Sequence, residues 1–167
     1  VRYQIERDSW APAGWDDDHA TYLPHLTSVA ASWDRNIAAL HGDVLGSEAR
    51  HRNKDFILGP GVNLARIPLY GRNFEYMGED PILAAKLAVP QIKAIQKHDV
   101  AATVKHYALN TQELNRIGVN AKPDERTLRE VYLPAFEYAV KDANVLGIMG
   151  AYNEYYGTNA NQSKHLV

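Results

Sequence analysis

Lys105 and His106 stand at the end of a short apolar run and are the side chains in this sequence most suited to chemistry. The run covers positions 100–104 and leads directly to an ammonium and an imidazole, then to the phenol of Tyr107 and the carboxamide of Asn110. An alanine-rich and β-branched run of this length is typical of a buried strand. A lysine at the end of such a strand must reach water, a partner or a ligand, because an unpaired buried charge is costly. The pattern predicts a binding site at the carboxyl end of a strand in a parallel sheet.

A second group of polar residues lies in the long stretch 62–80, which contains Arg72 and Glu75. A loop of this length in a compact domain is usually functional. We expect Glu75 to pair with an arginine and hold the loop in place. A guanidinium, an ammonium and an imidazole complement neighbouring hydroxyl groups on a sugar ring, each of which donates and accepts a hydrogen bond. Arg72, Lys105 and His106 together therefore predict a small polyhydroxylated ligand.

Several of these features also have simpler interpretations. An arginine in a loop is most often a surface charge, and a single histidine at a strand end is more often a satisfied hydrogen-bonding group than a catalyst. The glycines of Gly59-Pro60-Gly61 suggest a phosphate cradle, but no nucleotide-binding pattern is completed and Pro60 removes an amide donor, so a tight turn is favoured. The triple aspartate Asp16–Asp18 lacks the alternating spacing of a calcium loop, which favours a solvated loop.

The elements that would position these residues follow from apolar periodicity. The expected strands are 26–32, 55–58, 100–104 and 145–149, and the expected helices are 34–52, 80–97 and 124–139. Asp34, Asp80 and Asp124 stand at N-cap positions, and Pro134 should kink the third helix. Such alternation predicts an α/β fold with a parallel sheet and right-handed crossovers. Both half of an eight-stranded barrel and an open doubly wound sheet fit this pattern.

Composition narrows the class of protein. The 167 residues are about one domain, 46% of them are hydrophobic, and the formal net charge is -2. Basic residues are scattered, which gives no indication of nucleic-acid binding. No apolar run approaches the roughly 20 residues that span a bilayer, so no membrane partner is expected. The absence of cysteine excludes disulfides and thiolate chemistry in this chain and leaves the compartment open.

Read in order, the motifs resemble glycoside hydrolase family 3, the family of β-glucosidases and β-xylosidases. The matching stretches are Leu58–Asn63, Gly71–Glu75, Gly78–Pro81, Val104–His106, Asn110 with Asn115–Arg116, Asp124–Glu130, and Met149 with Tyr152–Asn153. The resemblance extends over almost the whole chain, and several such motifs in this order are specific. It implies a (β/α)8 TIM-type barrel, of which residues 1–167 would supply about half, without the nucleophile strand and the second domain.

The resemblance implies a role for each matching residue. Arg72, Lys105 and His106 would bind hydroxyl groups of the sugar at the non-reducing end. Arg116 and Tyr152 would lie next to the nucleophile and line the same subsite.

Two further residues follow from the resemblance, together with one departure from it. Met149 would lie close to the subsite, and Arg2 matches the arginine that ends a short Gly-Val-Arg segment of the family. The family nucleophile is an aspartate in a Ser-Asp-Trp-like tripeptide, whereas Ser32-Trp33-Asp34 has the wrong order and position, and Asp34 reads as a helix cap. The general acid/base, which usually comes from a second domain, is not matched either. No catalytic residue is therefore assigned to this chain.

The expected function is that of part of a retaining, exo-acting β-glycosidase that hydrolyses terminal non-reducing β-D-glucosyl residues. Two alternatives stay open: a non-catalytic carbohydrate-binding remnant or inactive fragment, and β-xylosidase specificity. The expected partners are a small carbohydrate and the remainder of the catalytic domain, and no cofactor or metal is implied. Val1 and the polar stretch 161–167 suggest an internal piece of a longer chain, inactive by itself. A periplasmic or secreted location is expected over the cytoplasm.

Overall fold

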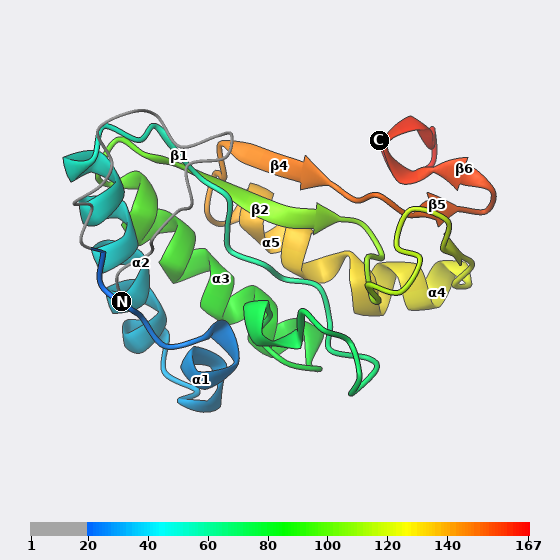
Figure 1. The fold of residues 1–167 in the computed structure, drawn as a ribbon, viewed down its shortest axis with the longest axis horizontal. Coiled ribbons are helices and arrows are strands. Elements are labelled where there is room, and N and C mark those ends of the chain that lie inside the picture. Colours follow the sequence, from blue (N-terminus) through cyan, green and yellow to red (C-terminus); the bar gives the residue numbers. More distant parts are fainter. Residues whose placement is uncertain (1–19) are drawn as a thin grey trace, which may run out of the picture.

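The computed structural model describes residues 20–167, which build a three-stranded parallel sheet covered by helices on one face (Figure 1). The strand order is β1-β2-β4, with β1 at Phe56–Ile57, β2 at Ala101–Tyr107 and β4 at Gly147–Gly150. The main helices are α2 (Arg35–His51), α3 (Pro81–Gln96) and α5 (Pro134–Lys141). Helix α3 packs between α2 and α5. A doubly wound sheet carries helices on both faces, so this arrangement indicates part of an α/β barrel, as one of the two expected architectures.

Shorter elements complete the described chain. These are α1 (Leu26–Ala31), the 3-10 turns η1 (Asn73–Glu75) and η3 (Ala160–Gln162), α4 (Glu125–Thr127), the π-helical turn η2 (Leu128–Tyr132), and a small sheet of β3 (Asn120–Ala121), β5 (Glu154–Tyr155) and β6 (Thr158–Asn159). The small sheet was not expected from the sequence, because two-residue strands leave no periodic signal.

Side-chain caps fix where the helices begin, as the sequence predicts. The carboxylate of Asp34 accepts a hydrogen bond from the backbone N–H of Asn36 at 2.7 Å, and Asp80 accepts one from the N–H of Leu83 at 2.6 Å. Pro81 follows at the first position of α3, where its missing N–H costs nothing. The Asp80 cap therefore ends the segment that carries Arg72, which begins after the last residue of α2 at His51.

Helices α2 and α3 approach so closely that only glycine fits at two positions. A Cβ atom on Gly42 would lie 2.4 Å from the carbonyl oxygen of Gln91, and one on Gly46 would lie 2.8 Å from that of Ile95. Both distances are shorter than van der Waals contact. Because the two backbones touch, α2 and α3 form one tightly packed pair beneath the sheet.

Strand β2 is the centre of the hydrophobic core. Ala102 and Val104 are fully buried, and they face the apolar side of α3, where Leu87, Ile92 and Ile95 are also buried. Strand β1 pairs with β2 in parallel, Phe56 opposite Ala101, and β4 pairs with its other edge, Thr103 opposite Gly147. The carboxyl ends of all three strands therefore point the same way (Figure 1).

Two expectations about local structure were wrong or incomplete. The expected strand 26–32 is instead helix α1 (Leu26–Ala31), since a short apolar run does not separate the two states and the helix buries Val29 and Ala30 against neighbouring helices. The third helix is divided, as Pro134 predicts, but into α4, the π-helical turn and α5. Asp124 does cap its beginning, with its carboxylate accepting from the N–H of Thr127 at 2.8 Å.

Candidate functional site

The carboxyl end of β2 presents Lys105 and His106 to the same side of the sheet. Lys105 pairs with Met149 in β4 and Tyr107 pairs with Gly150, so His106 is an extra residue that forms a β-bulge. We expected the strand to end at Val104, but it continues through Tyr107. Adjacent residues of a regular strand point to opposite faces. Because of the bulge, Lys105 and His106 can both face the same side.

Glu75 joins Arg72 to Lys105. The Arg72 guanidinium donates from Nε to Oε1 of Glu75 at 3.1 Å and from Nη2 to Oε2 at 2.8 Å, and Lys105 Nζ lies 3.2 Å from Oε2. All three side chains are largely buried, with exposed fractions of 16–24%. The two cations that the sequence places in different segments are thus held within one ion-paired cluster, and Glu75 fixes the loop as expected.

The same ion pairs determine protonation states. Burial raises the pKa of Glu75, but the hydrogen bond from Arg72 and the charge of Lys105 outweigh it, and the net pKa is below its usual value. The hydrogen bond to Glu75 raises the pKa of Arg72 further above its usual range. Glu75 is therefore an ionised acceptor at neutral pH and is poorly suited to act as an acid.

Glu113 extends the cluster toward Arg116 and Tyr152. Arg72 Nη1 lies 3.5 Å from Oε1 of Glu113, and Arg116 Nη1 donates to Oε2 of the same carboxylate at 2.9 Å. The Arg116 guanidinium lies over the ring of Tyr152, 4.9 Å from its centroid. The contacts thus run from Lys105 to Tyr152 through two carboxylates.

His106 lies behind this cluster and is 3% exposed. Its Nε2 is 3.2 Å from Nη2 of Arg72, and its Nδ1 is 3.1 Å from Oδ1 of Asn63 and 3.2 Å from the hydroxyl of Tyr76. Burial and then the charges of Arg72 and Lys105 lower the pKa of His106 to about 4. The imidazole is therefore neutral at physiological pH.

The structure brings together six of the seven residues singled out in the sequence. Arg72, Lys105 and His106 are in one cluster, Arg116 and Tyr152 are attached to it through Glu113, and Met149 is the strand neighbour of Lys105. Arg2 lies outside the described residues, as do Asp16–Asp18.

Sequence reasoning did not assign a role to Glu113, Asn63 or Tyr76. Glu113 stands three residues before Arg116, a spacing that favours ion pairs on one helical turn. Asn63 follows β1 as Asn110 follows β2, and a carboxamide after a buried strand is a usable signal. Tyr76 carried no signal, because a tyrosine in a loop is most often an ordinary packing residue.

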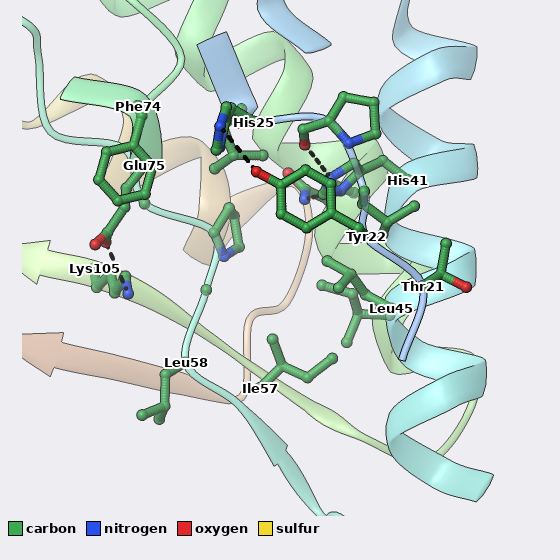
Figure 2. Close-up of a pocket in the computed structure, with 18 of the residues that line it drawn as sticks. Thr21, Tyr22, His25, His41, Leu45, Ile57, Leu58, Phe74, Glu75 and Lys105 are labelled. Atoms are coloured by element: carbon green, nitrogen blue, oxygen red, sulfur yellow. Dashed lines mark hydrogen bonds and ion pairs between the residues drawn. The ribbon is translucent and has the colours of Figure 1, made fainter. Parts of the chain in front are cut away.

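A cavity of about 510 Å³ adjoins the Glu75–Lys105 pair (Figure 2). Its wall includes the apolar side chains of Ile57 and Leu58. An aromatic row lies across from them: His25 contacts the ring of Phe74 at 5.3 Å and that of Tyr22 at 6.1 Å, both edge-on. Apolar and aromatic side chains therefore line this cavity together with the ion pair of Glu75 and Lys105.

The turn at Gly59-Pro60-Gly61 lines this cavity, but it does not begin a helix; the next α-helix starts only at Pro81. A phosphate cradle at a helix N-terminus is therefore not formed there. Within residues 20–167, no three His, Asp or Glu side chains gather as a metal site would require. None of the described helices combines the length and apolarity needed to cross a membrane.

The helix-covered parallel sheet and the polar cluster at the carboxyl ends of its strands define a domain of the α/β barrel class with a candidate site at its rim. The chain belongs to glycosyl hydrolase family 3. The model of the "Glycosyl hydrolase family 3 N terminal domain" matches residues 16–167.

Curated relatives agree with this assignment. The chain is 54% identical to beta-glucosidase BoGH3A of Bacteroides ovatus, over 99% of this chain and 22% of the relative. It is 45% identical to thermostable beta-glucosidase B of Acetivibrio thermocellus, over 89% of this chain and 20% of the relative. An exo-alpha-(1->6)-L-arabinopyranosidase of Bifidobacterium longum is 39% identical, over 91% of this chain and 20% of the relative. The chain therefore spans about a fifth of the length of these relatives.

Solved structures are similar over the same region. The beta-glucosidase DesR of Streptomyces venezuelae, determined in complex with D-glucose, superposes with a TM-score of 0.85 at 42% identity, covering 88% of this chain and 19% of that one. Beta-glucosidase 3B of Thermotoga neapolitana, in complex with glucose, also gives a TM-score of 0.85, at 40% identity over 87% of this chain and 20% of that one. Both likenesses confirm the partial barrel.

Proposed function

We propose that the full-length protein is a retaining, exo-acting β-glycosidase that removes terminal non-reducing β-D-glucosyl residues, and that residues 1–167 supply much of its sugar-binding surface. The observation that carries this proposal is the cluster of Arg72, Lys105 and Arg116 around two carboxylates at the strand ends. The names of the relatives, most of them β-glucosidases, support the same activity.

The hydrogen bonds of the cluster leave donors for a ligand. Lys105 has three N–H groups, and in the described part of the chain its ammonium contacts Glu75 alone. Lys105 also lines the cavity of Figure 2, so its remaining N–H groups can reach a hydroxyl there. Arg72, in contrast, uses Nε and Nη2 on Glu75 and His106, which leaves mainly Nη1. Lys105 is therefore the principal donor in this proposal.

The chemistry itself requires two further carboxyl groups. Retaining hydrolysis uses a pair about 5–5.5 Å apart, one as nucleophile and one as acid/base. Glu75 fits neither role, because both of its oxygens accept hydrogen bonds from Arg72 and its pKa is lowered. We assign the nucleophile and the acid/base to the full-length protein outside residues 1–167, and this chain by itself is then inactive.

We propose that the remainder of the barrel packs against the outer side of β4. Among residues 20–167, β4 has a strand neighbour on one edge only. A cavity of about 780 Å³ beside it is lined by apolar side chains that include Phe136, Ile148 and Leu166. An unpaired strand edge beside an apolar surface requires a cover.

The activity is tested with an aryl β-glucoside and the full-length protein. We expect release of the phenol, and a loss of about 10- to 150-fold in kcat/KM in Lys105→Ala, since a charged hydrogen bond contributes about 1.5–3 kcal/mol. Lys97→Ala is the matched control, because Lys97 follows the last residue of α3, lines neither cavity and makes an exposed ion pair with Asp43. An unchanged kcat/KM in Lys105→Ala would remove this residue from the site.

Substrate specificity needs a panel of sugars. An aryl β-xyloside tests the β-xylosidase alternative, and an aryl α-L-arabinopyranoside tests the activity named for the Bifidobacterium longum relative. A glucoside should give the highest kcat/KM. Binding of glucose measured by calorimetry without any hydrolysis would instead favour a non-catalytic carbohydrate-binding protein.

A further inference from the structure

A buried row of hydrogen-bonding side chains extends from His106 into the protein, away from the proposed ligand. Asn63 and Tyr76 contact the imidazole directly, and Tyr70 lies behind Tyr76, with their hydroxyls 2.9 Å apart. Asn63 is 5% exposed, Tyr70 is 4% exposed and Tyr76 is fully buried. The row ends at the backbone carbonyl of Asn110, 3.4 Å from the Tyr70 hydroxyl.

The direction of every bond in this row is fixed by its two ends. At one end Arg72 Nη2 can only donate, so Nε2 of His106 must accept. At the other end the carbonyl oxygen of Asn110 can only accept, so the Tyr70 hydroxyl donates to it. The Tyr70 oxygen then accepts a hydrogen bond from the Tyr76 hydroxyl, and the Tyr76 oxygen in turn accepts one from Nδ1–H of His106.

Asn63 enforces the same assignment independently. The backbone N–H of His106 donates to Oδ1 of Asn63 at 2.7 Å, and Nδ2 of Asn63 donates to the carbonyl oxygen of His106 at 3.0 Å. These two bonds orient the carboxamide. Its oxygen therefore faces Nδ1 at 3.1 Å, and an unprotonated Nδ1 there would place two acceptors against each other.

We propose that Asn63, Tyr76 and Tyr70 are positioning residues that hold His106 as the neutral Nδ1–H tautomer, so that its Nε2 is a permanent acceptor for Arg72. The proposal deepens the proposed function, because Arg72 belongs to the sugar site. With Nη2 held by His106 and Glu75, the guanidinium is orientated with Nη1 left toward Glu113 and a ligand. Protonation of His106 would place an N–H against Nη2 and release Arg72.

Three of the four charged groups that act on His106 favour its neutral form. Arg72, Lys105 and Arg116 all disfavour an imidazolium, and Glu75 is the carboxylate that favours it. Exchange of the Asn63 carboxamide for a carboxylate would add a second anion in direct contact with Nδ1. Such a contact stabilises the protonated ring and typically raises a histidine pKa by about 1–3 units.

The tautomer is tested by ¹⁵N NMR of the full-length protein labelled at histidine, recorded without any sugar. We expect His106 in the wild type to show a protonated Nδ1 and an unprotonated Nε2 from pH 8 to below pH 6. Tyr76→Phe should move the Nδ1 resonance, because one of its two acceptors is lost. Tyr107→Phe is the matched control: it removes a partly buried hydroxyl that donates to the carbonyl of Leu166, and it should leave the His106 resonances in place.

Asn63→Asp gives a functional readout. We expect His106 to titrate about 1–2 units higher than in the wild type, and the acidic limb of kcat/KM to move up with it. An Nε2–H tautomer in the wild type would overturn the proposal, and so would equal shifts in Tyr76→Phe and Tyr107→Phe. If Asn63→Asp does not fold, those two spectra still decide. A protein with the expected tautomer that hydrolyses no glycoside would refute the proposed function and leave this inference intact.

Discussion

Replacing Glu75 with glutamine tests whether one carboxylate holds the whole cluster. Glu75 makes two hydrogen bonds with Arg72 and an ion pair with Lys105, and its side chain is 24% exposed. Glutamine keeps the size and one acceptor oxygen, but it loses the charge and turns an N–H₂ group toward two cations. The change therefore removes two of the three charged contacts without creating a cavity.

The magnitude follows from these contacts. A hydrogen bond to a charged group contributes about 1.5–3 kcal/mol, so two of them amount to about 3–6 kcal/mol. Water reaches about a quarter of the side chain and offsets part of this loss. We expect the free energy of unfolding to fall by about 2–3 kcal/mol, with a loss of sugar affinity because Arg72 and Lys105 then repel each other.

Urea unfolding followed by circular dichroism measures this effect. The control is Glu130→Gln, since Glu130 pairs with Arg126 on the surface with exposed fractions of 60% and 82%. An exposed pair of this kind contributes at most about 0.5 kcal/mol. If Glu75→Gln shifts the midpoint no more than the control does, the idea that Glu75 organises the site is wrong.

Three further predictions concern pH, a helix cap and the rim of the site. The pKa of His106 is lowered from 6.5 to about 4, so between these pH values the unfolded chain binds more protons than the folded one. The free energy of unfolding should therefore fall by up to about 3 kcal/mol as the pH drops from 6.5 to 4, and the lowered pKa of Glu75 adds to the loss below pH 4.5. Equal urea midpoints at pH 7 and pH 4.5 would contradict this. Asp80→Ala removes the cap of α3 and should cost about 1 kcal/mol in thermal unfolding, and an unchanged Tm would show that the cap is unimportant. Tyr152→Leu removes the ring beneath Arg116 and should raise KM for an aryl glucoside a few-fold with little change in kcat. A large loss of kcat with an unchanged KM would contradict a role for Tyr152 in binding alone.

The regular elements were predictable because their signals are local. Caps such as Asp34 and Asp80, and the apolar spacing of α3, locate helices without any knowledge of the fold. The alternation of strands and helices limits the fold to two architectures. The choice of the barrel over the doubly wound sheet required the three-dimensional arrangement, because the apolar periodicity of a helix does not indicate which face of the sheet it covers.

The site was only partly predictable, for a related reason. Charged residues such as Arg72 and Lys105 stand out in a sequence, because an unpaired charge near a core needs a partner. The bulge at His106 depends on pairing with β4, which lies some forty residues further along the chain. The orientation of Asn63, which lies in the loop after β1, likewise depends on the backbone of His106 in β2. Such long-range contacts leave no trace in the neighbouring residues.

The close contact between α2 and α3 also fixes the two ends of the segment that carries Arg72. The segment from Asn53 to Asp80 leaves the end of α2 and returns at the start of α3, and Gly42 and Gly46 keep those helices in backbone contact. Its two ends are thus held at a constant separation, and β1 within it is held by its pairing with β2. Exchanging only residues 62–80 between family members should therefore carry the Arg72–Glu75 ion pair across while β1 keeps its register against β2.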